Sequence, residues 1–283
     1  LQGVRATVLH LSGPGDGVVL HMPAYHPFLD TIADMDRRLV EVERHDGVFD
    51  YDDLEARLAR SGASIWILCN PHNPLGYVFG RAELERVAEI AERYDITVIS
   101  DEIHADLTMP GQVHIPFESI GADASARAVT LMSASKAFNL AGLRWAVMHC
   151  GNDRLHQVLS GLPGHYLGAP NLMAVTATVA AWTDGDEWLA AVIDVLDENR
   201  HALTGLLADH LPGVAYRPPD ATYLTWLDCT ALGLGDNPAE TFLERGVALS
   251  PGPEFGPHGA GHARLNIATS PSVQAATIQA ISS

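Results

Sequence analysis

Lys136 is the leading candidate for a nucleophile in this sequence. It lies in the segment 133–144, SASKAFNLAGLR, where small residues flank the amine and an apolar turn follows it. Burial disfavours the charged form of a lysine, so its pKa falls and the amine becomes nucleophilic. A lysine alone is weak support, because most lysines are solvated surface groups. The residues that follow neighbouring predicted strands therefore decide the interpretation.

Two further segments, and the two ends of the segment 133–144 itself, offer partners for this amine. Asp101 follows a predicted strand, and its carboxylate could keep a pyridine nitrogen protonated so that the ring accepts electrons; taken alone it fits a helix N-cap equally well. Asn73, in NPHNPLG, could donate to a phenolic oxygen or simply form an Asn-Pro turn. Arg144 could bind a phosphate in bidentate fashion with the Ser133 hydroxyl, or it could form a surface ion pair.

The elements that must position these residues follow an alternating pattern. Short apolar runs between residues 18 and 150 alternate with amphipathic stretches, which is typical of a mostly parallel sheet covered by helices. Ligands bind such sheets beyond the carboxyl ends of the strands, where the polar segments lie. The predicted strands are 18–20, 39–42, 64–69, 96–99, 128–131 and 146–148, with a helix at 81–94.

The pattern changes after residue 152 to long helical stretches and short strands, which predicts a smaller α+β domain. The predicted fold class is α/β, with a three-layer α/β/α large domain at residues 1–190 and a small C-terminal domain at 191–283. The predicted elements of this second half are helices 171–182, 187–210 and 238–245 and strands 221–227, 247–250 and 263–267.

The composition restricts the partners of the protein. The 283 residues are 47% hydrophobic and 18% charged, with a net charge of -18, which argues against a nucleic acid or an anionic membrane as partner. No apolar run approaches the ~20 residues that span a bilayer, and no signal sequence opens the chain. Cys69, Cys150 and Cys229 lie far apart without a CxxC pair, which favours a reducing cytoplasm.

The motifs NPHNPLG, SDEIH and SASKAFNLAGLR, in this order and spacing, resemble those of the fold-type I aspartate aminotransferase superfamily, whose cofactor is pyridoxal 5'-phosphate (PLP). The resemblance covers essentially the whole chain. It implies that Lys136 forms a Schiff base with PLP, that Asp101 pairs with the pyridine nitrogen, and that Asn73 bonds O3′ of the ring. Ser133 and Arg144 would then hold the phosphate.

The resemblance extends to two more binding residues. Tyr25, in PAYHPF, matches the aromatic residue that stacks on the ring, although a core tyrosine is the ordinary interpretation of this position alone. Arg264, in ARLNIA, matches the arginine that binds the substrate carboxylate with a planar fork. His104 stands where classical aminotransferases carry tyrosine; it could donate to O3′ or be a core histidine. We expect His72 and His114 to be structural, and we predict no metal site.

Within the superfamily the sequence is most similar to the MalY/PatB group of carbon–sulfur β-lyases, through NPHNP, SDEIHAD, HIPF and SASKAFNLAG. This resemblance implies cleavage of cystathionine or another S-substituted cysteine to pyruvate, ammonia and a thiol. Lys136 would remove the Cα proton while the ring, protonated by Asp101, absorbs the charge. Transamination uses the same residues and stays open, as does a non-catalytic PLP-binding module. We expect residues 252–262 to shape selectivity at the entrance.

The start of the chain carries a further expectation. Residues 1–11 resemble a helix that ends at the turn 13–17, which lacks the Gly-Lys-Ser/Thr of a phosphate loop. Members of the superfamily begin well upstream, so the resemblance implies a preceding glycine turn that meets the phosphate and a tyrosine that reaches the neighbouring subunit's site. We therefore expect a homodimer with sites at the interface, and weak binding of PLP by residues 1–283 alone.

Overall fold

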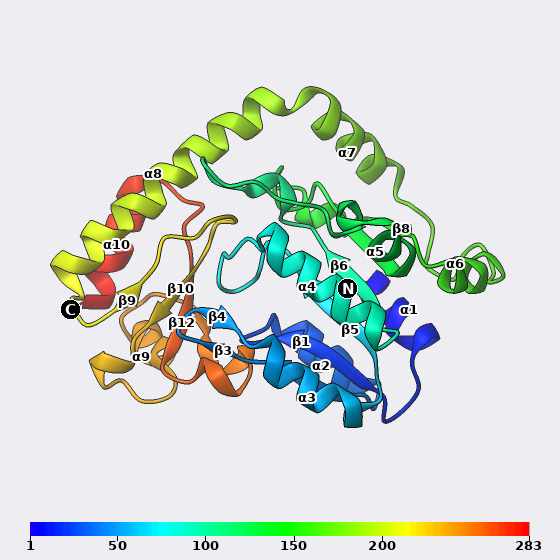
Figure 1. Ribbon diagram of the computed structural model, residues 1–283. Coiled ribbons are helices and arrows are strands. Elements are labelled where there is room, and N and C mark those ends of the chain that lie inside the picture. The colour runs from blue at the N-terminus through cyan, green and yellow to red at the C-terminus, as the bar shows by residue number, and fades with distance from the viewer. Residues whose placement is uncertain (283) are drawn as a thin grey trace.

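A six-stranded sheet forms the centre of the larger part of the molecule (Figure 1), and the computed structural model describes residues 1–282. The strand order is β2-β1-β5-β6-β7-β8, and all neighbours run parallel except β7 and β8. All six strands predicted before residue 150 are therefore confirmed, as is the mostly parallel sheet. Their bounds are β1 Gly17–His21, β2 Arg38–Val42, β5 Ala63–Cys69, β6 Thr97–Asp101, β7 Ala128–Met132 and β8 Val147–Cys150.

Helices cover both faces of this sheet. In β5, Trp66 and Leu68 pack into the core beneath one set of helices, while Ile65 and Ile67 pack into the core on the opposite face. Side chains of a strand alternate between its two faces, so two buried faces require the continuous apolar run seen in the sequence. The predicted three layers are therefore present. The covering helices are α1 Gln2–Leu11, α2 His26–Asp34 and α6 Asp153–Ser160 on one face and α3 Tyr51–Ser61, α4 Arg81–Arg93 and α5 Ala122–Arg127 on the other.

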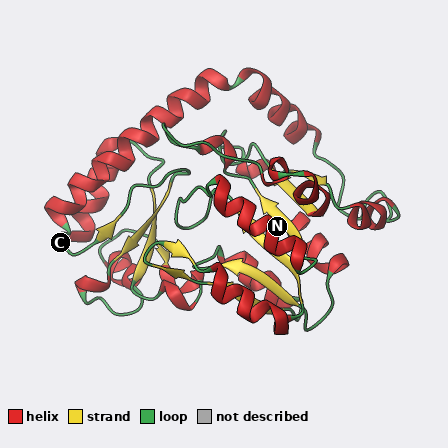
Figure 2. Ribbon diagram, in the orientation of Figure 1, coloured by secondary structure: helices red, strands yellow, loops and turns green. Residues whose placement is uncertain are grey.

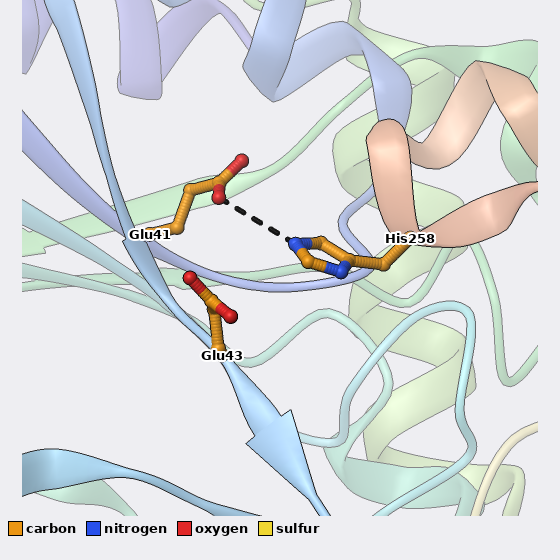
Figure 3. A group of neighbouring side chains, drawn as sticks. All are labelled: Glu41, Glu43 and His258. Carbon is orange, nitrogen blue, oxygen red and sulfur yellow. Dashed lines mark ion pairs between the residues drawn. The ribbon is translucent and has the colours of Figure 1, made fainter. Parts of the chain in front are cut away.

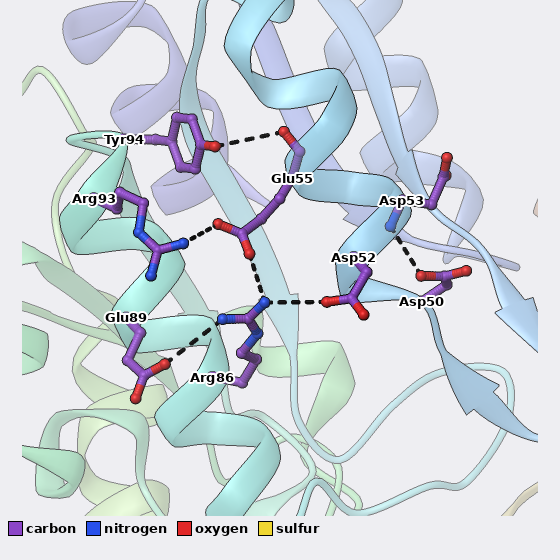
Figure 4. A network of polar contacts seen from close by, with 8 residues as sticks. All are labelled: Asp50, Asp52, Asp53, Glu55, Arg86, Glu89, Arg93 and Tyr94. Atoms are coloured by element: carbon purple, nitrogen blue, oxygen red, sulfur yellow. Dashed lines mark hydrogen bonds and ion pairs between the residues drawn. The ribbon is translucent and has the colours of Figure 1, made fainter.

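Ion pairs join α3 to α4 above the sheet (Figure 4). The Glu55 carboxylate of α3 accepts hydrogen bonds from Arg86, at 2.5 Å, and from Arg93, both on α4. Asp50 caps α3 by accepting from the Asp53 N–H at 2.9 Å. Partly exposed ion pairs of this kind contribute about 1 kcal/mol or less each, so the apolar core beneath them supplies most of the helix packing energy.

A second sheet, antiparallel and four-stranded in the order β11-β12-β10-β9, forms the centre of the smaller part (Figures 1 and 2). Its core includes Leu203, Phe242 and Ile278, each from a different helix. The bounds are β9 Ala215–Tyr216, β10 Leu224–Asp228, β11 Ser250–Pro251 and β12 His262–Asn266, with α7 Leu172–Asp184, α8 Asp186–His210, α9 Pro238–Glu244 and α10 Pro271–Ser282; a separate hairpin consists of β3 Arg44–His45 and β4 Val48–Phe49.

Two predicted strands of the smaller part begin later than the sequence indicates. The strand predicted at 221–227 starts only at Leu224, because Thr222 has a φ of +70° and breaks the extended backbone. The strand predicted at 247–250 pairs only from Ser250, opposite Arg264. Val247 and Leu249 instead pack against the core as a loop, so their apolar character reflects burial without strand pairing.

Helix α8 connects the two parts of the molecule and runs with α7 as an arch over the top of Figure 1. Trp188, in the first turn of α8, stacks on Phe138 with a distance of 5.6 Å between the ring centroids. Leu196 and Leu203, further along the helix, pack into the core of the smaller part. The predicted division at residue 190 therefore lies within a continuous helix and stays a prediction. No helix within residues 1–282 is long and apolar enough to cross a membrane.

Candidate active site

Lys136 and Asp101 both lie at the carboxyl end of the parallel sheet. Asp101 is the last residue of β6, and Lys136 lies in the loop that follows the neighbouring strand β7. The positive charge of Lys136 lowers the pKa values of both Asp101 and His104, so the amine lies near both. The Lys136 side chain has no hydrogen bond or ion pair with the described residues. It is also the only lysine in the 283-residue sequence, a compositional signal that motif reading alone does not use.

Asp101 is a buried carboxylate with little to balance its charge. Burial raises its pKa to about 6, the Glu102 carboxylate adds to this increase, and nearby positive charges, among them Lys136, oppose it. The Ile103 N–H donates to its Oδ1 at 3.3 Å, a local turn that resembles the alternative N-cap interpretation. The ionised form of a buried carboxyl group is costly when the group is alone, and a cation beside it makes that form favourable. The site therefore fits the protonated ring nitrogen that the resemblance implies.

His104 is neutral at physiological pH. Burial, reinforced by the charges of Lys136 and Arg264, lowers its pKa to about 3. Its Nδ1 is buried and has no hydrogen-bond partner within residues 1–282. A buried polar atom without a partner is costly in a folded protein, so this nitrogen fits a hydrogen bond to a group bound beside it.

Arg264 links the two parts of the molecule at the site. Its Nη1 donates to Asn73 Oδ1 at 2.9 Å, its Nη2 donates to Ser250 Oγ at 3.0 Å, and its Cζ lies 4.9 Å from the centre of the Phe255 ring. Because a guanidinium can only donate, the Asn73 amide presents its oxygen to Arg264. The Asn73 NH2 group, which donates to no described residue, therefore remains free for an acceptor such as a phenolic oxygen.

Tyr25 lies beside the same group, at the N-terminus of α2. Burial raises its pKa; the charge of Arg264 opposes that increase and the charge of Asp101 adds to it, so the phenol lies near both residues. Its ring makes edge contacts with His26 and Phe28, at centroid distances of 5.1 and 5.5 Å. These contacts fix the ring plane, as a stacking residue requires.

Ser133 and Arg144 differ in their burial and in their contacts. The Ser133 hydroxyl is buried, donates to the Trp145 carbonyl at 2.7 Å and accepts from the Ser135 N–H at 3.1 Å. Arg144 is exposed, has a φ of +51°, and its side chain has neither an ion pair nor a hydrogen bond with residues 1–282. The alternative of a surface ion pair for Arg144 is thus not seen, and the role of both residues in phosphate binding stays a prediction.

Sequence reasoning missed Glu102, which fixes the end of β6. Its Oε1 accepts from the Ser100 hydroxyl at 2.8 Å and from the Phe117 N–H at 3.0 Å, while its Oε2 lies 2.9 Å from His114 Nε2. Glu102 is only 3% exposed, so these contacts hold a buried charge. His114 therefore has a structural role, and the adjacent Asp101 sits on an anchored strand end.

A second polar group outside this site contains residue types that bind metals (Figure 3). Glu41 of β2, Glu43 just after the end of β2, and His258 of the short turn Pro257–Gly259 place possible ligand atoms within 4.8 Å of one another. Glu41 pairs with His258 at 3.5 Å, and Glu43 pairs with Arg57 at 3.8 Å. Each carboxylate thus already has a polar partner, and we interpret the group as contacts that join the end of β2 to α3 and to the turn that contains His258.

Fold and site together define an α/β enzyme with a lysine amine at the centre of its site. The chain belongs to the aminotransferase class I and II family, whose model matches residues 2–281. The cystathionine beta-lyase PatB of Bacillus subtilis is 38% identical over 261 residues, which are 89% of this chain and 67% of PatB. Protein MalY of Escherichia coli is 37% identical over 271 residues, covering 93% of this chain and 69% of MalY.

The solved structures agree with this assignment. The PLP-bound C–S lyase from Staphylococcus hominis superposes with a TM-score of 0.91 at 32% sequence identity, and the match covers 99% of this chain and 74% of that one. A match of this extent confirms the fold-type I architecture that the motifs imply.

Proposed function

We propose that this protein is a PLP-dependent carbon–sulfur β-lyase that cleaves cystathionine or another S-substituted cysteine to pyruvate, ammonia and a thiol. The observation that carries the proposal is the group in which Lys136 and Asp101 follow neighbouring strands at the carboxyl end of the sheet while Arg264 contacts Asn73. The similarity to PatB and to the lyase from Staphylococcus hominis supports carbon–sulfur cleavage over other reactions of the family.

Several residues of the chain would hold the cofactor. Asp101 keeps the pyridine nitrogen protonated, the Asn73 NH2 group donates to O3′, and Tyr25 stacks on the ring. His104, being neutral, adds a hydrogen bond without a charge. When bound, PLP supplies an electron sink for the pair of electrons that remains when the Cα–H bond breaks. Ser133 and Arg144 hold the phosphate.

Lys136 moves the proton that the reaction requires. Arg264 binds the α-carboxylate and so orients the substrate with its Cα–H bond toward the Lys136 amine. Lys136 then accepts the Cα proton, a step for which a positioned general base contributes about 10²–10⁴ in rate. Loss of the proton allows the Cβ–S bond to break, and the sulfur leaves as a thiolate. Water completes the release of pyruvate and ammonia.

Product analysis tests this function. Protein saturated with PLP is incubated with L-cystathionine, and free thiol, pyruvate and ammonia are measured. We expect the three products to form in equal amounts without added keto acid. Amino exchange that depends on a keto acid and releases no thiol would assign an aminotransferase instead. PLP binding without either reaction would favour the non-catalytic module.

The Arg264→Ala variant should raise KM for cystathionine about 100-fold, because a bidentate bond between guanidinium and carboxylate contributes roughly 3 kcal/mol. Arg264→Lys should recover only part of this loss, since an ammonium lacks the planar fork. The matched control is Arg217→Ala, in the same part of the molecule, whose side chain is 65% exposed and pairs with Asp220 at 3.0 Å. Steady-state kinetics decide: an unchanged KM in Arg264→Ala would remove this residue from the site.

We also propose that the protein functions as a homodimer in a reducing cytoplasm, with the division into residues 1–190 and 191–283 as its domains. Helix α7 supports the dimer, because it exposes large apolar side chains, among them Leu172 at 76% and Met173 at 70%, which mark a surface for association. The three cysteines are unpaired, which is consistent with a reducing compartment.

A further inference from the structure

Tyr223 is a half-buried residue beside the site to which none of the motifs assigns a role. Its ring lies edge-on to the ring of His104, with a centroid distance of 6.1 Å. Its hydroxyl makes no hydrogen bond within residues 1–282. A partly buried tyrosine usually has a partner for its hydroxyl, so a phenol whose ring lies beside His104 and whose hydroxyl has no protein partner is available to a ligand.

The electrostatic interactions of Arg264 give further information on the position of the Tyr223 phenol. Tyr25 and Tyr223 each raise the pKa of Arg264, and Arg264 in turn opposes the increase that burial causes in the pKa of each phenol. The guanidinium and both phenols therefore lie within electrostatic range of one another. A phenol is protonated at neutral pH, and burial raises the pKa of Tyr223 further, so this hydroxyl can donate a hydrogen bond.

The backbone that carries Tyr223 is held in a strained turn. Thr222 is fully buried and has a φ of +70°, a conformation that a β-branched residue rarely adopts. Its N–H donates to the Leu107 carbonyl at 2.8 Å, and the Ala221 N–H donates to the Gly76 carbonyl at 3.0 Å. Such strain persists only where the surroundings determine it, and it gathers at functional sites.

The contacts of this turn tie it to both cofactor-binding loops. Leu107 follows the segment that contains His104, and Gly76 closes the loop that contains Asn73. A Cβ atom at Gly76 would collide with Pro219, so the small residue permits this close approach. The position of Tyr223 is therefore fixed relative to His104 and Asn73 and does not depend on the small sheet alone.

We propose that the Tyr223 hydroxyl is a second donor to the substrate α-carboxylate that Arg264 binds, which makes Tyr223 a residue that determines specificity for α-amino acids. This inference rests on the proposed function. Arg264 already gives one N–H to Asn73 and one to Ser250, and three remain for the substrate. A carboxylate has about four acceptor positions, so the phenol satisfies a position that the guanidinium fork leaves open.

The test compares two ligands that differ only in the carboxylate. One is α-methyl-S-ethylcysteine, in which a methyl group replaces the Cα hydrogen so that no elimination follows. The other is the corresponding amine in which a second methyl group replaces the carboxylate, so that it too lacks a Cα hydrogen. Each is titrated into PLP-saturated protein, and the dissociation constant is read from the cofactor absorbance. Tyr223→Phe should weaken the acid about tenfold and the amine less than about twofold, because one hydrogen bond to a charged group is lost.

The matched control is Tyr216→Phe. Tyr216 lies in the same small sheet, but its hydroxyl donates to the Arg200 carbonyl at 2.9 Å, away from the site, so both dissociation constants should stay unchanged. Equal weakening of acid and amine by Tyr223→Phe, or no weakening of either, would overturn the inference. Thiol release from cystathionine is measured in parallel: its absence in the wild-type protein refutes the lyase, while the ligand pair still decides the role of Tyr223.

Discussion

Lys136→Ala is expected to abolish thiol release from cystathionine and to remove the visible absorbance of bound cofactor. The variant loses both the amine that bonds to the cofactor and the base that takes the Cα proton, so kcat should fall by more than about 10³. Because Lys136 is the only lysine in the sequence, no other side-chain amine can replace it. Absorbance spectra and a thiol assay at saturating PLP provide the measurement.

Borohydride reduction gives a direct form of the same experiment. It should fix a phosphopyridoxyl group on Lys136, after which trypsin cannot cleave there and releases the single peptide 128–144, between Arg127 and Arg144. The α-amino group of the chain used in the experiment is the control site, because it is the only other primary amine within residues 1–283. Label found only on that amine, or full activity of Lys136→Ala, would contradict the assignment of the site.

Asp101→Asn is expected to stabilise the cofactor-free protein at pH 8 while lowering its rate of catalysis once cofactor is added. Burial raises the pKa of Asp101 from 3.8 to about 6, so the folded state binds this proton more tightly than the unfolded state. The associated stability is present below pH ~4 and is lost as the pH rises toward ~6. A shift of this size corresponds to a cost on the order of 2–3 kcal/mol above that pH.

Denaturant unfolding of both proteins at pH 4 and pH 8 measures this difference. The free energy of unfolding of Asp101→Asn should exceed that of the wild type at pH 8 only. The same variant should lose about 10³ in kcat with PLP, because a neutral amide cannot keep the ring nitrogen protonated. Equal stability at pH 8 would show that Asp101 is not a strained carboxylate in the folded protein.

Asp123→Asn is the matched control for the sign of this effect. Asp123 is exposed, and the hydrogen bond from Arg127 lowers its pKa. Its contribution to stability is therefore present above its unfolded pKa and lost as the pH falls, opposite to that of Asp101. Removing the Asp123 carboxylate should thus destabilise the protein slightly at pH 8. An increase in stability there would indicate a general charge effect, since the chain carries a net charge of -18.

The large sheet and the positions of its reactive residues follow from local features of the sequence. Apolar runs of strand length, each followed by a polar segment, are local features, and parallel strands bring their carboxyl ends to one edge. Asp101 and Lys136 were therefore predictable as neighbours, and so was the loop that contains Asn73. The small sheet was less predictable, because 247–250 is apolar through burial in a loop and Thr222 interrupts 221–227 through its backbone conformation.

The contribution of the second half of the chain to the site became visible only in the folded structure. The hydrogen bond from Arg264 to Asn73 joins residues 191 positions apart, and no spacing rule predicts that Ser250 and Phe255 hold the same guanidinium. Burial also sets the charge states of the site. It lowers the pKa of His104, so that this residue is neutral, and it raises the pKa of Asp101. Such shifts depend on the surroundings of a residue in the fold and cannot be read from its type. The sequence thus identifies Lys136 and Asp101, whereas their pKa values and those of their neighbours depend on how the chain packs around them.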